Sequence, residues 1–122
     1  LDLPPWWRVY GGGMSETPIF ACDIFAMTPD QRARHAALAQ RFRDEARLEE
    51  LPDGYAFVFE PDEERALKLT EFMALERRCC PFLHLAVEFL PSGGPLRLRL
   101  TGAPGVKPFL VNELGLTQET QV

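Results

Sequence analysis

The chain has 122 residues, which suits one domain and leaves no room for two of ordinary size. Its 46% apolar and 25% charged residues predict a globular protein with a packed core, and no apolar run approaches the roughly 18 residues of a membrane span. The formal net charge of −5 argues against the clustered Lys and Arg of a nucleic-acid-binding surface.

The first thirteen residues, LDLPPWWRVYGGG, differ in composition from the rest. Their three glycines resemble an engineered linker, and Trp6, Trp7 and Arg8 are residue types that anchor interfaces. Two interpretations are open: an expression remnant or extension, or a ligand peptide tethered to its receptor. In the second case residues 1–10 mimic a peptide or protein partner. We expect 1–13 to be non-native, 14–116 to form a single α+β domain, and 117–122 to be a tail.

Four elements are predicted in the first half of the domain. Residues 19–27, IFACDIFAM, are expected to form a strand that carries Cys22. The sequence Thr-Pro-Asp-Gln at 28–31 supplies an N-cap, a proline at N1 and a glutamine at N3, which predict a helix to about Ala46. Two strands are expected around a Pro-Asp-Gly turn at 52–54, and the alternation in the second, YAFVF, indicates a half-buried strand.

The second half continues the same alternation of helix and strands. A helix is expected from about Pro61, with acidic residues in its first turn, to Cys80, where Pro81 ends it. Two alternating strands, PFLHLAVEFLP and PLRLRLTG, follow, and a last helix is expected between Pro108 and Gly115. The order βαββαββα predicts the α+β class and a ferredoxin-like sandwich, with helices on one face of an antiparallel sheet.

The adjacent thiols Cys79 and Cys80 are the most specific chemical feature. Helical spacing places Glu76 one turn before both sulfurs. Soft thiolates select thiophilic ions such as Hg(II), As(III), Cu(I) or Zn, whereas structural zinc prefers cysteines separated by about two to four residues. The predicted ligands and their flanking residues are Cys79, Cys80, Cys22 and Glu76, with Arg77, Arg78 and Phe82 beside them.

The electrostatics of a helix end disfavour a reactive thiol. The partial negative charge of the helix C-terminus and the carboxylate of Glu76 are both expected to raise the thiol pKa values, unless Arg77 and Arg78 fold back towards the sulfurs. Free cysteines are also common as buried packing residues. A purely structural role therefore stays open for the pair, and it is the preferred interpretation of Cys22 taken alone.

Cysteine usage and the missing secretory pattern bear on location and partners. Three cysteines, two of them adjacent, do not match a secreted disulfide framework, and no basic segment precedes an apolar one, so we expect a cytoplasmic protein. We expect no nucleic-acid and no membrane partner, and a homo-oligomer stays open. His84, Glu88, Arg97 and Arg99 are interpreted as a solvated sheet face with cross-strand Glu–Arg pairs.

The segments ELPDGYAFVF, ALERRCCPFLHLAVEF and LRLRLTGAPGVKPFL resemble a family of small, mostly uncharacterised bacterial proteins with an E-R-x-C-C-P-F core. Related segments occur near or within MerR-type regulators. The resemblance extends from Ile19 to Leu110, and a family cysteine in the first strand corresponds to Cys22. The resemblance implies a link to thiophilic metals, and it assigns no role to His84.

The sequence thus predicts a non-enzymatic cytoplasmic domain that binds or senses a soft metal or metalloid through Cys79 and Cys80. A peptide-binding adaptor, whose ligand is the segment 1–10, is the first alternative. A thiol-dependent enzyme is the second, and it would need an activating base beside Cys80.

Overall fold

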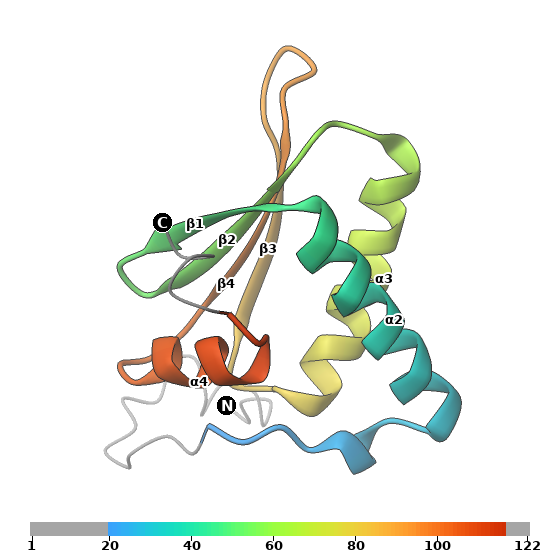
Figure 1. Cartoon of the computed structure of the whole chain (residues 1–122), viewed down its shortest axis with the longest axis vertical. Helices are drawn as coiled ribbons and strands as arrows, with labels where there is room; N and C mark the ends of the chain where they lie inside the picture. Colours follow the sequence, from blue (N-terminus) through green and yellow to red (C-terminus); the bar gives the residue numbers. More distant parts are fainter. Residues whose placement is uncertain (1–19, 117–122) are drawn as a thin grey trace, which may run out of the picture.

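The computed structural model describes residues 20–116 (Figure 1). In this part of the chain the elements follow the order η1 (Ile24–Ala26), α2 (Pro29–Glu45), β1 (Arg47–Leu51), β2 (Gly54–Phe59), α3 (Glu63–Cys79), β3 (His84–Phe89), β4 (Leu96–Thr101) and α4 (Val106–Glu113). The four strands form one antiparallel sheet in the order β1-β2-β4-β3. No helix among these residues has the length and hydropathy needed to span a membrane.

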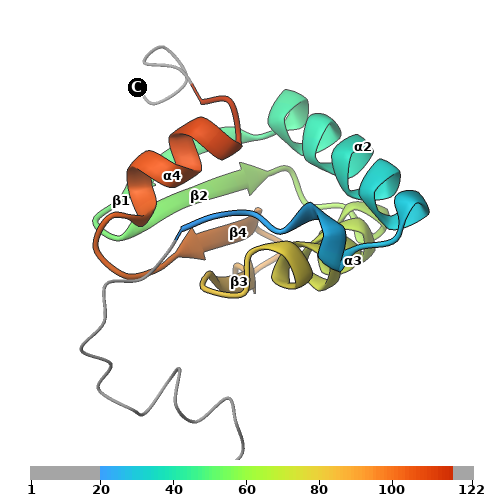
Figure 2. The same ribbon diagram turned by 90° about the horizontal axis from the view of Figure 1, so that it is seen from below.

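The helices pack on one face of the sheet and enclose the core there (Figures 1 and 2). The alternating sequence of β4 explains the division between the two faces. Leu96, Leu98 and Leu100 are at most 4% exposed, whereas Arg97 lies on the opposite face and pairs with Glu88 and Glu49. The α+β class, the antiparallel sheet and the cross-strand Glu–Arg pairing are therefore confirmed.

Strand β2 is buried along its whole length, so its prediction as a half-buried strand was wrong. Ala56 and Val58 lie on the outer face, opposite Arg99 and Arg97 of β4. Long arginine side chains cover apolar surface with their methylene groups while the charged ends stay near water. The short side chains of β2 are therefore buried beneath their longer neighbours.

The predicted starts of both long helices are confirmed. The hydroxyl of Thr28 accepts a hydrogen bond from the Gln31 amide (3.2 Å), and the Gln31 side chain accepts one from the Thr28 amide (2.9 Å). Asp62 caps α3 by accepting from the backbone N–H of Arg65 (2.8 Å). Each cap satisfies amide groups that have no partner within the helix.

The strand predicted at 19–27 is not formed by the described part of that segment. Residues 20–23 are irregular and Ile24–Ala26 form a 3-10 turn, because the Asp23 carboxylate accepts a hydrogen bond from the Phe25 amide (3.1 Å). Ile24 and Phe25 are 47% and 82% exposed, so the apolar alternation does not reflect burial in a sheet. The described order is αββαββα after the 3-10 turn. Phe89, at the end of β3, is also exposed although the alternation of that strand places it on the face of the leucines.

Two leucines of α3 provide a matched test of the core. Leu69 is 0% exposed and Leu67 is 72% exposed. Leu69→Ala should lower the free energy of unfolding by about 2–5 kcal/mol, because it removes a buried side chain and leaves a cavity. Leu67→Ala should change it by less than about 0.5 kcal/mol. Urea denaturation measures both, and equal losses would contradict this core.

Candidate metal centre

The segment before α2 brings Cys22 to the end of α3. The backbone N–H of Asp23 donates a hydrogen bond to the carbonyl of Cys79 (2.8 Å). On the other side of Cys22, the ring of Phe20 packs edge-on against Phe82 (centroids 5.2 Å apart). In Figures 1 and 2 this blue segment passes from α4 to α3. Cys22 is therefore held by contacts on both of its flanks.

The three cysteine sulfurs of the described residues converge. The Sγ atoms of Cys79 and Cys80 lie 3.7 Å apart, and those of Cys22, Cys79 and Cys80 all lie within 4.8 Å of one another. Successive helical residues would point about 100° apart. Cys80, however, is the C-cap of α3 and leaves the helix with φ −127° and ψ 68°, so its side chain is free to turn towards that of Cys79.

The sulfurs differ in their access to solvent. Cys79 and Cys80 are 0% exposed, whereas Cys22 is partly exposed. Burial alone would fit a packing role. The convergence of three sulfurs next to buried polar groups supports a site instead, since apolar packing requires neither feature.

A buried His–Glu pair lies beside the sulfurs. The Nε2 atom of His35, on α2, forms a short hydrogen bond with the carboxylate of Glu76, whose side chain is only 2% exposed. The imidazole also stacks on Phe72 with the centroids 5.1 Å apart. Ligand atoms of His35, Glu76 and Cys79 lie within 4.8 Å of one another. Glu76 therefore approaches Cys79, as its helical spacing predicts.

His35 was not among the predicted site residues, although the sequence contains a clue to it. His35, Leu38 and Phe42 follow one another at helical spacing, so the imidazole lies on the stripe of α2 that faces the core. A polar side chain on a buried stripe needs a hydrogen-bonding partner. Glu76 is that partner, and only the packing of α2 against α3 identifies it.

The thiols influence one another's pKa values. The hydrogen bond from the Cys80 thiol is the largest influence on Cys79 and lowers its pKa to about 7, although burial opposes the shift. Donating that bond, together with burial, raises the pKa of Cys80. Burial, followed by the neighbouring Cys79, raises the pKa of Cys22. The expectation of raised pKa values is thus confirmed for Cys80 and wrong for Cys79.

Two opposed influences act on the pKa of the His35 imidazole. Burial alone would lower its pKa, but the hydrogen bond and negative charge of Glu76 outweigh burial and raise it above the ordinary value. A raised pKa means that the protonated imidazole is stabilised in the folded protein.

The remaining predicted site residues have other surroundings or lie outside the described residues. Arg77 and Arg78 are exposed on the last turn of α3, and neither is among the groups that shift the thiol pKa values. Phe82 packs edge-on against Phe20 and Phe109, and thus supports the segment that carries Cys22. The peptide anchors Trp6, Trp7 and Arg8 lie outside residues 20–116, and their role stays a prediction.

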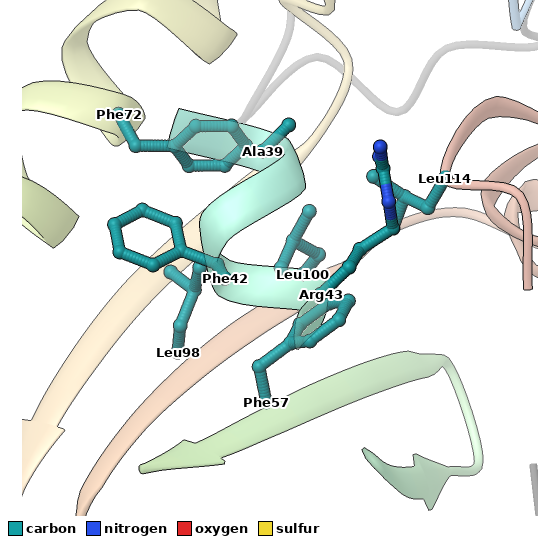
Figure 3. Close-up of a pocket in the computed structure, with 8 residues that line it drawn as sticks. All are labelled: Ala39, Phe42, Arg43, Phe57, Phe72, Leu98, Leu100 and Leu114. Atoms are coloured by element: carbon teal, nitrogen blue, oxygen red, sulfur yellow. The ribbon is translucent and has the colours of Figure 1, made fainter. Parts of the chain in front are cut away.

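A pocket between α2 and the sheet does not offer an alternative ligand site. It encloses about 10 Å³, room for no more than one water molecule. Figure 3 shows its lining, which is apolar except for one arginine: Ala39, Phe42, Arg43, Phe57, Phe72, Leu98, Leu100 and Leu114. The space is a packing defect of the core.

Comparisons with protein-family models, with curated proteins and with solved structures gave no match. The features of this domain that bear on its function are therefore the geometry of the sulfur site and the buried pair His35–Glu76.

One thiol should ionise near neutral pH. In the reduced protein, the ultraviolet absorbance of thiolate should show one midpoint at about pH 7, from Cys79, and further ionisation only above the ordinary value of 9.0. Cys80→Ala should raise the first midpoint, because the hydrogen bond that stabilises the Cys79 thiolate is lost. Absence of any thiolate below pH 9 would contradict the proposed coupling.

The pair His35–Glu76 should make stability depend on pH. Because the folded-state pKa of His35 is raised, its contribution is fully present below the ordinary value of 6.5 and is lost as the pH rises through the folded-state pKa. The double variant His35→Gln/Glu76→Gln keeps a hydrogen bond without either titrating group. The difference in free energy of unfolding, wild type minus variant, should therefore fall above about pH 6.5 in urea denaturation. A difference that stays constant with pH would refute the assignment.

Proposed function

We propose that this domain binds or senses a soft, thiophilic metal or metalloid ion through Cys22, Cys79 and Cys80. The observation that carries the proposal is the convergence of their three sulfurs within 4.8 Å. Thiolates are the ligands that ions such as Hg(II), As(III), Cu(I) and Zn prefer over harder cations. Three such donors around one point supply most of the coordination shell of any of them.

The separation of the sulfurs supports a shared ion. Two thiolates on one tetrahedral zinc, each bonded at about 2.3 Å, lie about 3.8 Å apart. Cys79 and Cys80 are already separated by 3.7 Å. Binding at these two residues thus requires little movement. The sulfur of Cys22, within 4.8 Å of both, needs to move only a short distance towards them.

Burial supports binding over catalysis. An ion held by Cys79 and Cys80 would be enclosed by residues with no solvent exposure, which leaves a substrate little access to it. A catalytic ion keeps an open coordination position. We therefore propose a cytoplasmic, non-enzymatic role in which the ion is the ligand itself.

The direct test is uptake by the reduced, metal-free protein. Separate solutions of Hg(II), As(III), Cu(I) and Zn, followed by gel filtration and elemental analysis, should give one bound ion per chain for at least one of these ions. Cys79→Ser/Cys80→Ser should abolish uptake, because it removes two of the three thiols of the chain.

His84→Ala is the matched control. It removes the exposed histidine outside the site, and uptake should persist. Circular dichroism of each variant separates loss of ligands from loss of fold. Failure of the wild type to take up any of the four ions, or equal uptake by the double variant, would overturn the proposal.

A further inference from the structure

The sulfur site offers one ion three ligands. Within residues 20–116, the donor atoms that converge with both Cys79 and Cys80 come from Cys22 alone. The nearest other donors, His35 and Glu76, converge with Cys79 and are already hydrogen-bonded to each other. An ion that prefers three sulfur ligands in a pyramid fits this arrangement better than an ion that needs four.

The charge of the bound complex discriminates among three-coordinate ions. Three thiolates around a divalent ion leave one net negative charge, and around Cu(I) they leave two. Three thiolates around a trivalent ion leave none. Burying an uncompensated charge is costly, and Cys79 and Cys80 have no solvent contact to offset it.

The surroundings supply no surplus positive charge. His35 is hydrogen-bonded to the carboxylate of Glu76, so any charge on the imidazole already has a partner. The C-terminal end of α3 adds partial negative charge beside the thiols. Arg77 and Arg78, next to the thiols in sequence, are exposed residues. Each of these features disfavours an anionic complex relative to a neutral one.

We propose that the preferred ligand is a trivalent pnictogen hydroxide, arsenous acid or its antimony analogue, which all three cysteines bind together. This inference rests on the proposed function and narrows it to one class of ion. In the reaction As(OH)₃ + 3 RSH → As(SR)₃ + 3 H₂O, three As–S bonds replace three As–O bonds. Each thiol proton leaves with a hydroxide as water, and no atom changes oxidation state. The product is neutral, as the buried site requires.

Cys22 makes the difference between a two-sulfur and a three-sulfur site. Phenylarsine oxide has two exchangeable positions, so it needs only Cys79 and Cys80. In Cys22→Ser, phenylarsine oxide should bind as it does to the wild type, whereas affinity for arsenite should fall by at least about 100-fold. The retained binding of phenylarsine oxide shows that Cys79 and Cys80 are still reduced and available, and circular dichroism shows whether the variant is folded. Equal affinity of wild type and variant for arsenite would overturn the three-sulfur assignment.

His84→Ala, which lies outside the site, is the matched control for Cys22→Ser. It should bind arsenite within a few-fold of the wild type. A loss comparable to that of Cys22→Ser would show that the effect is not specific to the third sulfur and would overturn the inference.

Proton release separates the two classes of ion without depending on the thiol pKa values. A divalent ion displaces the thiol protons into solution, whereas arsenous acid carries them away as water, so release should differ by about three protons per site. In weakly buffered solution, Cd(II) should acidify the medium and arsenite should not. Binding of Cd(II) or Hg(II) with no binding of arsenite would overturn this inference and leave the proposed function standing. Binding of no thiophilic ion would overturn both.

Discussion

The arrangement of the site depends on one hydrogen bond between main-chain atoms, from the N–H of Asp23 to the carbonyl of Cys79. The last carbonyls of a helix have no hydrogen-bond donor within the helix, and the N–H of Asp23 provides the donor for one of them, the carbonyl of Cys79. The same contact sets the residue before Asp23 beside the thiols. Without it Cys22 would be held on one flank only, by the packing of Phe20 against Phe82, and the pair Cys79–Cys80 would be a two-sulfur site. An ion bound by Cys22, Cys79 and Cys80 together would add a second link, through side chains, between this segment and the end of α3.

The second constraint is a polar interaction inside an apolar environment. Glu76 is buried among residues that form the core, and its carboxylate is hydrogen-bonded to the imidazole of His35. Loss of one partner from such a pair leaves a buried group without compensation, which costs more than the pair contributes when intact. The stacking of His35 on Phe72 fixes the ring against this carboxylate. The polar neighbours of the thiols are thus held by α2 and α3 packing together, independently of any ion.

Local patterns were sufficient for most of the fold. The capping box at Thr28, the acidic start of α3 and the strict alternation in β4 each act over a few residues, so their effects are visible in sequence. The segment at 19–27 shows the limit of this reasoning, since its alternation resembles a strand while its hydrogen bonds go to the end of α3 and to its own 3-10 turn. Glu76 could be placed near the thiols from helical spacing. The contribution of Cys22 and the partnership of His35 with Glu76 depend on contacts between elements far apart in the chain, which spacing does not encode.

Three sulfurs that bind one ion are the central requirement, and X-ray absorption spectroscopy of the arsenite-loaded, reduced protein examines that coordination directly. A single shell of three sulfur atoms at one distance, with no oxygen or nitrogen in the first shell, is the expected spectrum. A shell of two sulfurs completed by an oxygen would show that Cys22 does not take part, and it would contradict the geometry on which the proposed function depends.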